Sequence, residues 1–118
     1  MKEILREIYD RAAKTGSSLI NRVDKTTLGN MMAAFESIDD PEEATKFLIA
    51  YTARQIGRRE IPRPIGQNIL KDIVFIYKNC SSDELRSMIF KYLTLLRWFY
   101  ECGYHNLNSF DDFINKLR

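Results

Sequence analysis

The side chains best suited to catalysis or metal binding are few in this sequence. His105 is the only histidine, and Cys80 and Cys102 are the only cysteines. A structural zinc site takes four ligands of these types, and three residues cannot complete one. The sequence also lacks a glycine-rich phosphate loop and a G-x-S-x-G nucleophile motif. We therefore predict a protein with no catalytic residues, no metal and no cofactor, rather than an enzyme.

The remaining candidates for chemistry have a structural interpretation. Asp39-Asp40 and Asp111-Asp112 are pairs of adjacent carboxylates, but each pair begins a predicted helix, where acids interact favourably with the helix dipole. The two cysteines lie at the C-terminal ends of predicted helices, and we interpret them as buried free thiols. A disulfide between them stays open as an alternative.

Charge is distributed unevenly along the chain, although the net charge is only +2. Residues 36–43 contain five acids and no base, whereas residues 54–71 contain five bases and one acid. Such asymmetry creates a local field that the net charge hides. The candidate nucleic-acid-binding residues are the bases of this segment and one lysine beyond it: Arg54, Arg58, Arg59, Arg63, Lys71 and Lys78. An ordinary solvated loop that faces an acidic helix start is the alternative explanation.

Three aromatic side chains lie outside the apolar stripes of their predicted helices. Phe75 stands on the polar side of one helix, and Phe90 and Trp98 stand outside the core stripe of the next. A helix that is apolar nearly all round is buried on two sides or forms an interface. Aromatic rings interleaved with Arg and Lys also fit single-stranded nucleic acid, whose bases stack on them. We take these three residues as candidate interface residues, with burial inside the bundle as the alternative.

Helical periodicity and capping signals divide the chain into five or six helices. The first predicted helix covers about Lys2 to Lys14 and stops at Gly16, and the second follows Asp24. The third runs from Asp40-Pro41 to Gly57, and the fourth begins at about Pro64. The fifth runs from Ser81 to Cys102-Gly103, and a short sixth covers Phe110 to Leu117. Two prolines predict an extended linker from Arg58 to Pro64. No segment alternates with a period of two, so we expect no sheet. The prediction is one all-α domain over residues 1–118, a compact five- to six-helix bundle.

Helical wheels assign a core side to each of these helices. The third predicted helix carries Ala44, Phe47 and Leu48 at its apolar positions. In the fourth, Asp72 falls on the polar side with Gln67 and the lysines. No apolar run approaches the ~20 residues of a membrane span, and the charged first residues contain no signal-peptide core. We expect a cytoplasmic protein in a reducing environment, with no membrane partner.

Three stretches of the sequence carry a family resemblance. They are Thr26-Thr27-Leu28 at a helix start, residues 48–55 (LIAYTARQ) with bases after them, and the aromatic helix from Lys91-Tyr92-Leu93 to Trp98-Phe99-Tyr100. With these features, residues 27–100 resemble the small helical subunit of class 1 CRISPR effector complexes, most closely the type III-A subunit. Two prolines between residues 58 and 64 depart from the family pattern.

The resemblance implies a non-enzymatic subunit of an antiviral ribonucleoprotein. Such subunits line up in several copies along the effector and contact the guide RNA–target duplex or the target strand through basic surfaces. The resemblance places Arg54, Arg58 and Arg59 on that basic surface. It also implies that the partners are RNA, other effector subunits and further copies of the chain. The alternative is a helical protein–protein interaction module, an adaptor or regulator that uses the aromatic residues. A DNA-binding helix-turn-helix fits less well, because the proline-bearing turn exceeds the usual ~3–4 residues.

Overall fold

The computed structural model describes residues 2–118, and within that range it consists of helices, turns and loops without a strand. The elements are α1 (Lys2–Ser18), α2 (Lys25–Glu36), α3 (Pro41–Gly57), α4 (Arg63–Asn79), α5 (Ser82–Glu101) and α6 (Phe110–Lys116). The prediction of an all-α bundle is therefore confirmed. No helix in the described range is long and apolar enough to cross a membrane.

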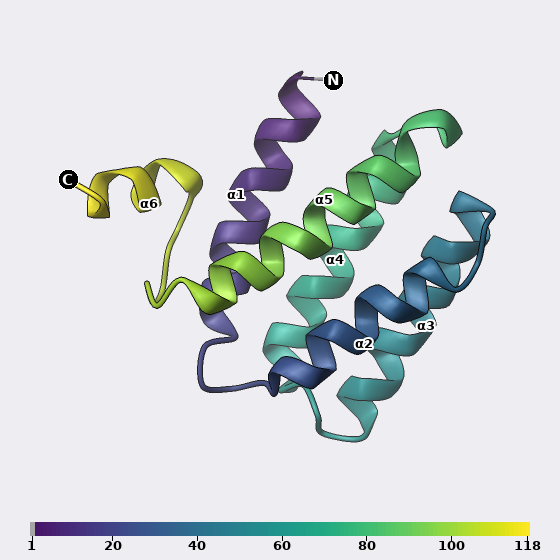
Figure 1. Ribbon diagram of the computed structural model, residues 1–118, viewed down its shortest axis with the longest axis horizontal. Helices are drawn as coiled ribbons and strands as arrows, with labels where there is room; N and C mark the ends of the chain where they lie inside the picture. Colours follow the sequence, from purple (N-terminus) through teal and green to yellow (C-terminus); the bar gives the residue numbers. More distant parts are fainter. Residues whose placement is uncertain (1) are drawn as a thin grey trace.

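The helices form two layers (Figure 1). In one layer α4 lies between α1 and α3 and contacts both, and in the other layer α5 and α2 pack across them. The molecule measures 41 × 35 × 19 Å, so its thinnest dimension is close to two helix diameters of ~10 Å. The short α6 stands apart from both layers and packs against α1. The core fills the space between the layers, and its largest fully buried side chains include Ile8, Phe35, Leu48, Ile69, Ile89 and Tyr92.

Side-chain caps fix the starts of several helices where the sequence predicts them. Asp40 accepts a hydrogen bond from the Glu43 amide at 3.0 Å, with Pro41 in the first helical turn. Ser109 accepts one from the Asp112 amide at 3.1 Å. Each bond satisfies an amide that has no partner inside its helix. These caps depend on residues only three apart, which is why the sequence alone could predict them.

The predicted stop of the first helix at Gly16 is wrong, because α1 continues to Ser18. Gly16 is buried where α1 crosses α5. A Cβ atom at this position would lie 2.7 Å from the backbone oxygen of Leu96 and 2.9 Å from the Cβ of Phe99. The glycine therefore permits the close approach of two helices and does not terminate one.

Candidate nucleic-acid interface

The basic turn, which we define as residues 54–63, joins α3 to α4. The Arg59 amide donates to the carbonyl of Ile56 at 3.0 Å, and the Glu60 amide donates to that of Gln55 at 2.9 Å. This pair of hydrogen bonds is the Schellman motif, which terminates many helices. Ile61 then turns inward and is fully buried. The predicted extended linker is confirmed only at Pro62, whose φ and ψ are −57° and 137°. The rest of the prediction is wrong, because the chain folds back over residues 58–62 and α4 begins at Arg63, with Pro64 in its first turn.

Arg59 occupies a backbone position that favours glycine. Its φ is +65°, in the left-handed region, at the residue after the C-cap of α3. A side chain with a Cβ costs roughly 1–2 kcal/mol in that region relative to the right-handed one, and glycine is the usual choice there. An arginine at this position keeps its charge on the turn in spite of the conformational cost.

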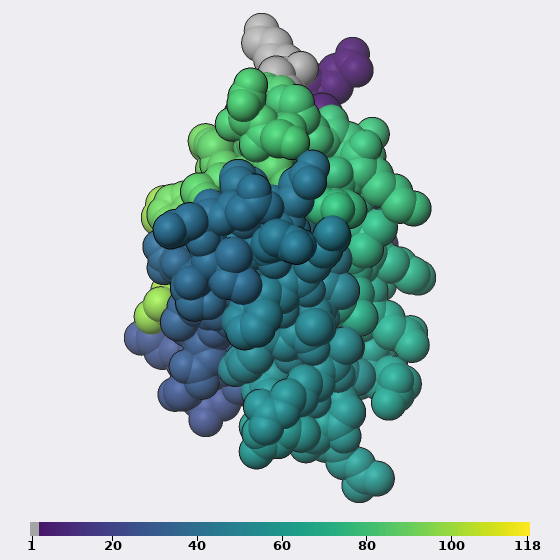
Figure 2. All heavy atoms as spheres, turned by 90° about the vertical axis from the view of Figure 1, so that its right-hand side faces the viewer, coloured from purple at the N-terminus to yellow at the C-terminus, as the bar shows by residue number. Residues whose placement is uncertain are grey.

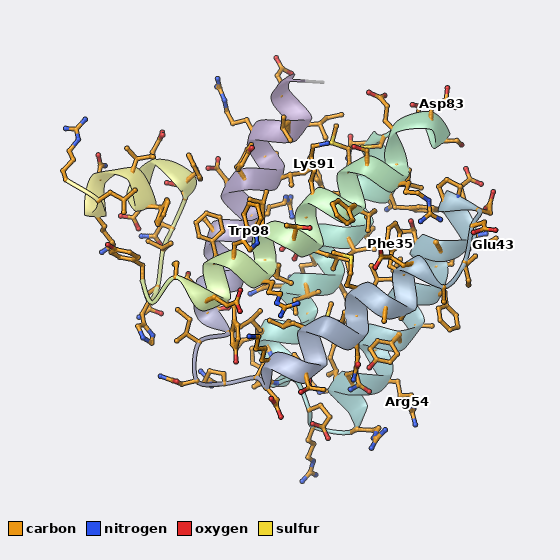
Figure 3. The ribbon with its side chains drawn as sticks, in the orientation of Figure 1. Phe35, Glu43, Arg54, Asp83, Lys91 and Trp98 are labelled. Carbon is orange, nitrogen blue, oxygen red and sulfur yellow. The ribbon has the colours of Figure 1, made fainter. Side chains whose placement is uncertain are left out.

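The arginines of the basic turn are exposed and unpaired. Arg54, Arg58, Arg59 and Arg63 all lie on the surface, and none of them forms an ion pair with any residue in the range 2–118. The acids of residues 36–43 lie at the opposite end of α3, whose 17 residues span about 25 Å. Figure 3 shows Glu43 and Arg54 at these two ends, and in Figure 2 the turn forms the lower end of the molecule.

Two lysines of α4 extend this surface to different degrees. At about 100° per residue, Lys71 and Lys78 fall within about 80° of Arg63 on the exposed face of α4. Lys71 lies about 12 Å along the helix from Arg63, whereas Lys78 lies about 22 Å away. Lys78 is therefore near the acidic start of α3, where Ser82 donates to Glu42 at 3.1 Å. The structure brings the four arginines together, with Lys71 as an extension, and leaves Lys78 apart.

The three candidate interface aromatics differ in exposure. Trp98 and Phe90 of α5 are 61% and 46% exposed, and Figure 3 labels Trp98 on this helix. Phe75 is half-buried, because α1 lies beside α4 and places the Arg11 guanidinium 4.2 Å above its ring. The interface prediction for Phe75 thus gives way to a packing role, while Phe90 and Trp98 remain candidate interface residues.

Phe47 is an exposed aromatic that the sequence pattern had placed in the core. It is 47% exposed on α3, and the prediction of burial is wrong. The buried face of α3 instead follows Ala44, Leu48 and two threonines, Thr45 and Thr52. The buried face of α3 therefore includes two polar side chains, and Phe47 lies outside it. Periodicity alone could not distinguish a threonine in the core from a phenylalanine outside it.

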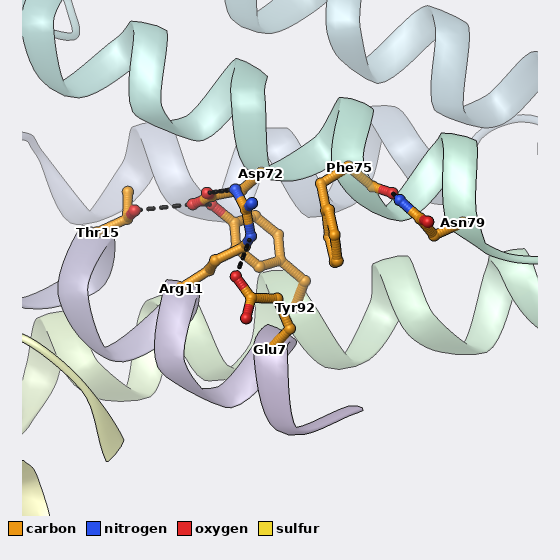
Figure 4. Close-up of polar contacts among 7 residues, drawn as sticks. All are labelled: Glu7, Arg11, Thr15, Asp72, Phe75, Asn79 and Tyr92. Atoms are coloured by element: carbon orange, nitrogen blue, oxygen red, sulfur yellow. Dashed lines mark hydrogen bonds and ion pairs between the residues drawn. The ribbon is translucent and has the colours of Figure 1, made fainter. Parts of the chain in front are cut away.

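A buried polar cluster around Asp72 was missed from the sequence, which placed Asp72 on the polar side of its helix. Asp72 is only 4% exposed. Its Oδ2 accepts hydrogen bonds from the hydroxyls of Thr15 and Tyr92, each at 2.7 Å, and its Oδ1 pairs with Arg11 at 3.0 Å. Arg11 also pairs with Glu7 at 3.0 Å, as Figure 4 shows. We call these five residues the Asp72 cluster.

The Asp72 cluster joins three helices and stabilises their arrangement. Burial raises the pKa of Asp72, and hydrogen bonds from Tyr92, Thr15 and Arg11 oppose the rise. Burial, together with the adjacent carboxylate, raises the pKa of Tyr92 well above its usual value, so this hydroxyl remains a donor. One sequence signal was available: a tyrosine in a core stripe needs a polar partner for its hydroxyl.

The residues first considered for chemistry are dispersed. Cys80 and Cys102 are both free and half-buried, and His105 is exposed in the loop before α6. Within residues 2–118, no three His, Cys, Asp or Glu side chains form a group that could hold a metal ion. The basic turn and the exposed side of α5 are therefore the surfaces on which function can be argued.

Comparison with known proteins finds no matching family model, no similar curated protein and no similar solved structure.

Proposed function

We propose that this protein is a non-catalytic small subunit of a CRISPR ribonucleoprotein effector complex in the cytoplasm. In this role it contacts the backbone of guide or target RNA through the basic turn. It contacts neighbouring subunits, including further copies of itself, through the exposed aromatic side of α5.

The observation that carries the proposal is the set of four exposed, unpaired arginines on one turn, one of them in a glycine-favouring conformation. Charges held for stability are normally paired or dispersed, whereas these share one end of the molecule. Glu60 is the one acid within the turn, and the acids of residues 36–43 lie at the far end of α3. A phosphate backbone is the polyanion that such a cluster neutralises. The resemblance of residues 27–100 to the CRISPR small subunits supports RNA as the polyanion.

The mechanism is electrostatic and independent of RNA sequence. Arginine forms paired hydrogen bonds with phosphate oxygens, and contacts of this kind fix position without reading bases. Phe90 and Trp98 are exposed on α5, which lies in the other layer of the bundle from α3 and α4. A subunit can therefore bind RNA at the end that carries the basic turn and a neighbouring protein through α5, so that successive copies align their basic turns.

Binding of fluorescein-labelled single-stranded RNA at several salt concentrations tests the proposal. Each phosphate contact contributes a slope of about −0.7 to log K against log salt for single strands. Replacing Arg54, Arg58 and Arg59 together by alanine should flatten the slope by about 2. A matched control replaces Lys91, Lys116 and Arg118, which removes the same charge from α5 and the C-terminus and should change the slope by much less. Equal effects of the two triple variants would reject the basic turn as the RNA site.

A protein–protein interaction module is the second candidate, favoured by the exposure of Trp98 and Phe90. A large aromatic side chain at the centre of an interface is a typical hot spot. Under this alternative, RNA binding is weak and indifferent to the arginine triple variant, while Trp98→Ala abolishes association. Sedimentation velocity of the wild type and Trp98→Ala measures that association directly. Association of the wild type without any RNA affinity would favour this second function.

A further inference from the structure

A hollow of about 360 Å³ opens between α1 and α4, beside the loop that precedes α6. Its lining comes from three separate parts of the chain and includes Lys14, Thr15, Asn68, Lys71, Asp72 and Asn108. Ligand pockets have volumes of roughly 300–1,000 Å³, so this one suits a single small ligand or one unit of a polymer. Among its outer residues only Lys71 has been given a role above, as an extension of the basic turn.

The carboxylates of this hollow are already engaged by the protein. Asp72 forms the floor, where it accepts from Thr15 and Tyr92 and pairs with Arg11. Glu7 pairs with the same guanidinium, so the charge of Arg11 is also used. Asp10, at the edge, accepts a hydrogen bond from the Phe110 amide at 2.9 Å. These contacts lower the capacity of the hollow to attract a cation.

The lysine and asparagine side chains of the hollow have no bonding partner among the described residues. Lys14 and Lys71 are exposed, line the hollow from opposite helices, and form no ion pair with any residue that the structure describes. The side-chain amides of Asn68 and Asn108 likewise make no hydrogen bond within residues 2–118, although the backbone amide of Asn108 donates to Asp112. Two ammonium groups fit a phosphate, and two amides with both donors and acceptors fit a base edge or a ribose.

We propose that this hollow binds one nucleotide unit, with its phosphate between Lys14 and Lys71 and its nucleoside against Asn68 and Asn108. The inference deepens the proposed function, on which it rests for the identity of the polymer. Lys71 shares the exposed face of α4 with Arg63 at a separation of about 12 Å along the helix, so a strand bound at the basic turn can continue into the hollow. The hollow then holds a nucleotide in a defined position, whereas the turn supplies general phosphate attraction.

A ¹⁵N NMR titration with uridine 5′-monophosphate tests this site. The side-chain amide signals of Asn68 and Asn108 should shift and saturate, and uridine without its phosphate should bind about tenfold more weakly or worse, because charge-assisted bonds to the phosphate are lost. The double variant Lys14→Gln/Lys71→Gln should lower the affinity by a similar factor. The matched control Arg58→Gln/Arg59→Gln removes two charges from the basic turn and should leave mononucleotide binding unchanged.

The outcomes separate this inference from the proposed function. Loss of mononucleotide binding in the lysine variant but not in the arginine control supports the hollow, whatever the salt slope of long RNA. Tighter binding of a uridine tetranucleotide than of the monophosphate, reversed by the arginine control, identifies an RNA strand as the source; equal binding identifies a free nucleotide. Unshifted asparagine signals, equal loss in both double variants, or equal binding of inorganic phosphate and the nucleotide would overturn the inference.

Discussion

Arginine has contrasting environments in the Asp72 cluster and in the basic turn. Arg11 pairs with Asp72 and Glu7 and covers the ring of Phe75, so its charge and its apolar surface are both used inside the protein. Arg59, by contrast, is exposed, makes no ion pair within the described range and adopts a backbone conformation typical of glycine.

The two environments imply different roles for the two charges. A guanidinium that closes a buried cluster contributes to stability, and its removal leaves another charge without a partner. A guanidinium on an unpaired turn contributes little to stability and is accessible to a partner outside the chain. The comparison predicts that substitutions in the two regions separate stability from binding.

The largest expected effect is loss of stability on Asp72→Asn. The amide carries no charge and offers one acceptor oxygen in place of two, so the ion pair with Arg11 is lost, and at neutral pH we expect a decrease of about 2–4 kcal/mol in the free energy of unfolding. The triple alanine variant of Arg54, Arg58 and Arg59 should change it by no more than about 0.5 kcal/mol per site. Urea denaturation followed by circular dichroism measures both, and equal losses would contradict the division between the two regions.

A smaller loss is expected from Gly16→Ala, because the Asp72 cluster requires α1 to lie close to the helices that it contacts. The added Cβ meets the backbone of α5, which should destabilise the fold by about 1–3 kcal/mol in spite of the better helix propensity of alanine. Gly29→Ala is the matched control within α2, since nothing lies within 4 Å of its added Cβ. That variant should gain about 0.5–1 kcal/mol. Thermal unfolding of both variants separates the effect of the steric contact with α5 from the effect of helix propensity. Stabilisation by both substitutions would contradict the close approach of α1 to α5.

The pH dependence of stability should reveal the raised pKa of Asp72. Because the folded protein binds this proton more tightly than the unfolded chain, the contribution of Asp72 is greatest at low pH. It declines as the pH rises from the ordinary carboxyl value near 3.8 through the raised one. The difference in unfolding free energy between the wild type and Asp72→Asn should therefore narrow with rising pH across this window. Carboxyl ¹³C NMR of Asp72 gives an independent check, and a pKa below 3.8 would reverse the predicted trend.

The smallest effect is expected in the basic turn itself, from Arg59→Gly. Glycine relieves the left-handed conformation but adds freedom to the unfolded chain, so the net stabilisation should be at most about 1 kcal/mol. The same substitution should remove one phosphate contact and flatten the salt slope for RNA by about 0.7. A variant that is more stable yet binds RNA less tightly would sharpen the comparison. Unchanged RNA binding would place the strand elsewhere on the surface.

The part of the fold that could be predicted is the part set by neighbours in the sequence. Asp40, Pro41 and Glu43 begin α3 through contacts across three residues, and Ser109 begins α6 in the same way. The clustering of arginines after residue 53 was equally visible, since a turn keeps consecutive residues together. Their freedom from ion pairs was not visible, because it depends on where the ends of α3 and α4 lie.

Which polar and aromatic side chains are covered depends on the packing of helices that are distant in the chain. Asp72 and Phe75 both belong to the polar side of α4 by periodicity, yet α1 covers them with Arg11, and the hydroxyls of Thr15 and Tyr92 complete the carboxylate's partners. The helices and the position of the basic turn could be predicted, because propensity, capping and turn geometry act over a few residues. Burial and ion pairing are set by helices distant in the chain, and no periodicity within one helix specifies which neighbour will cover it.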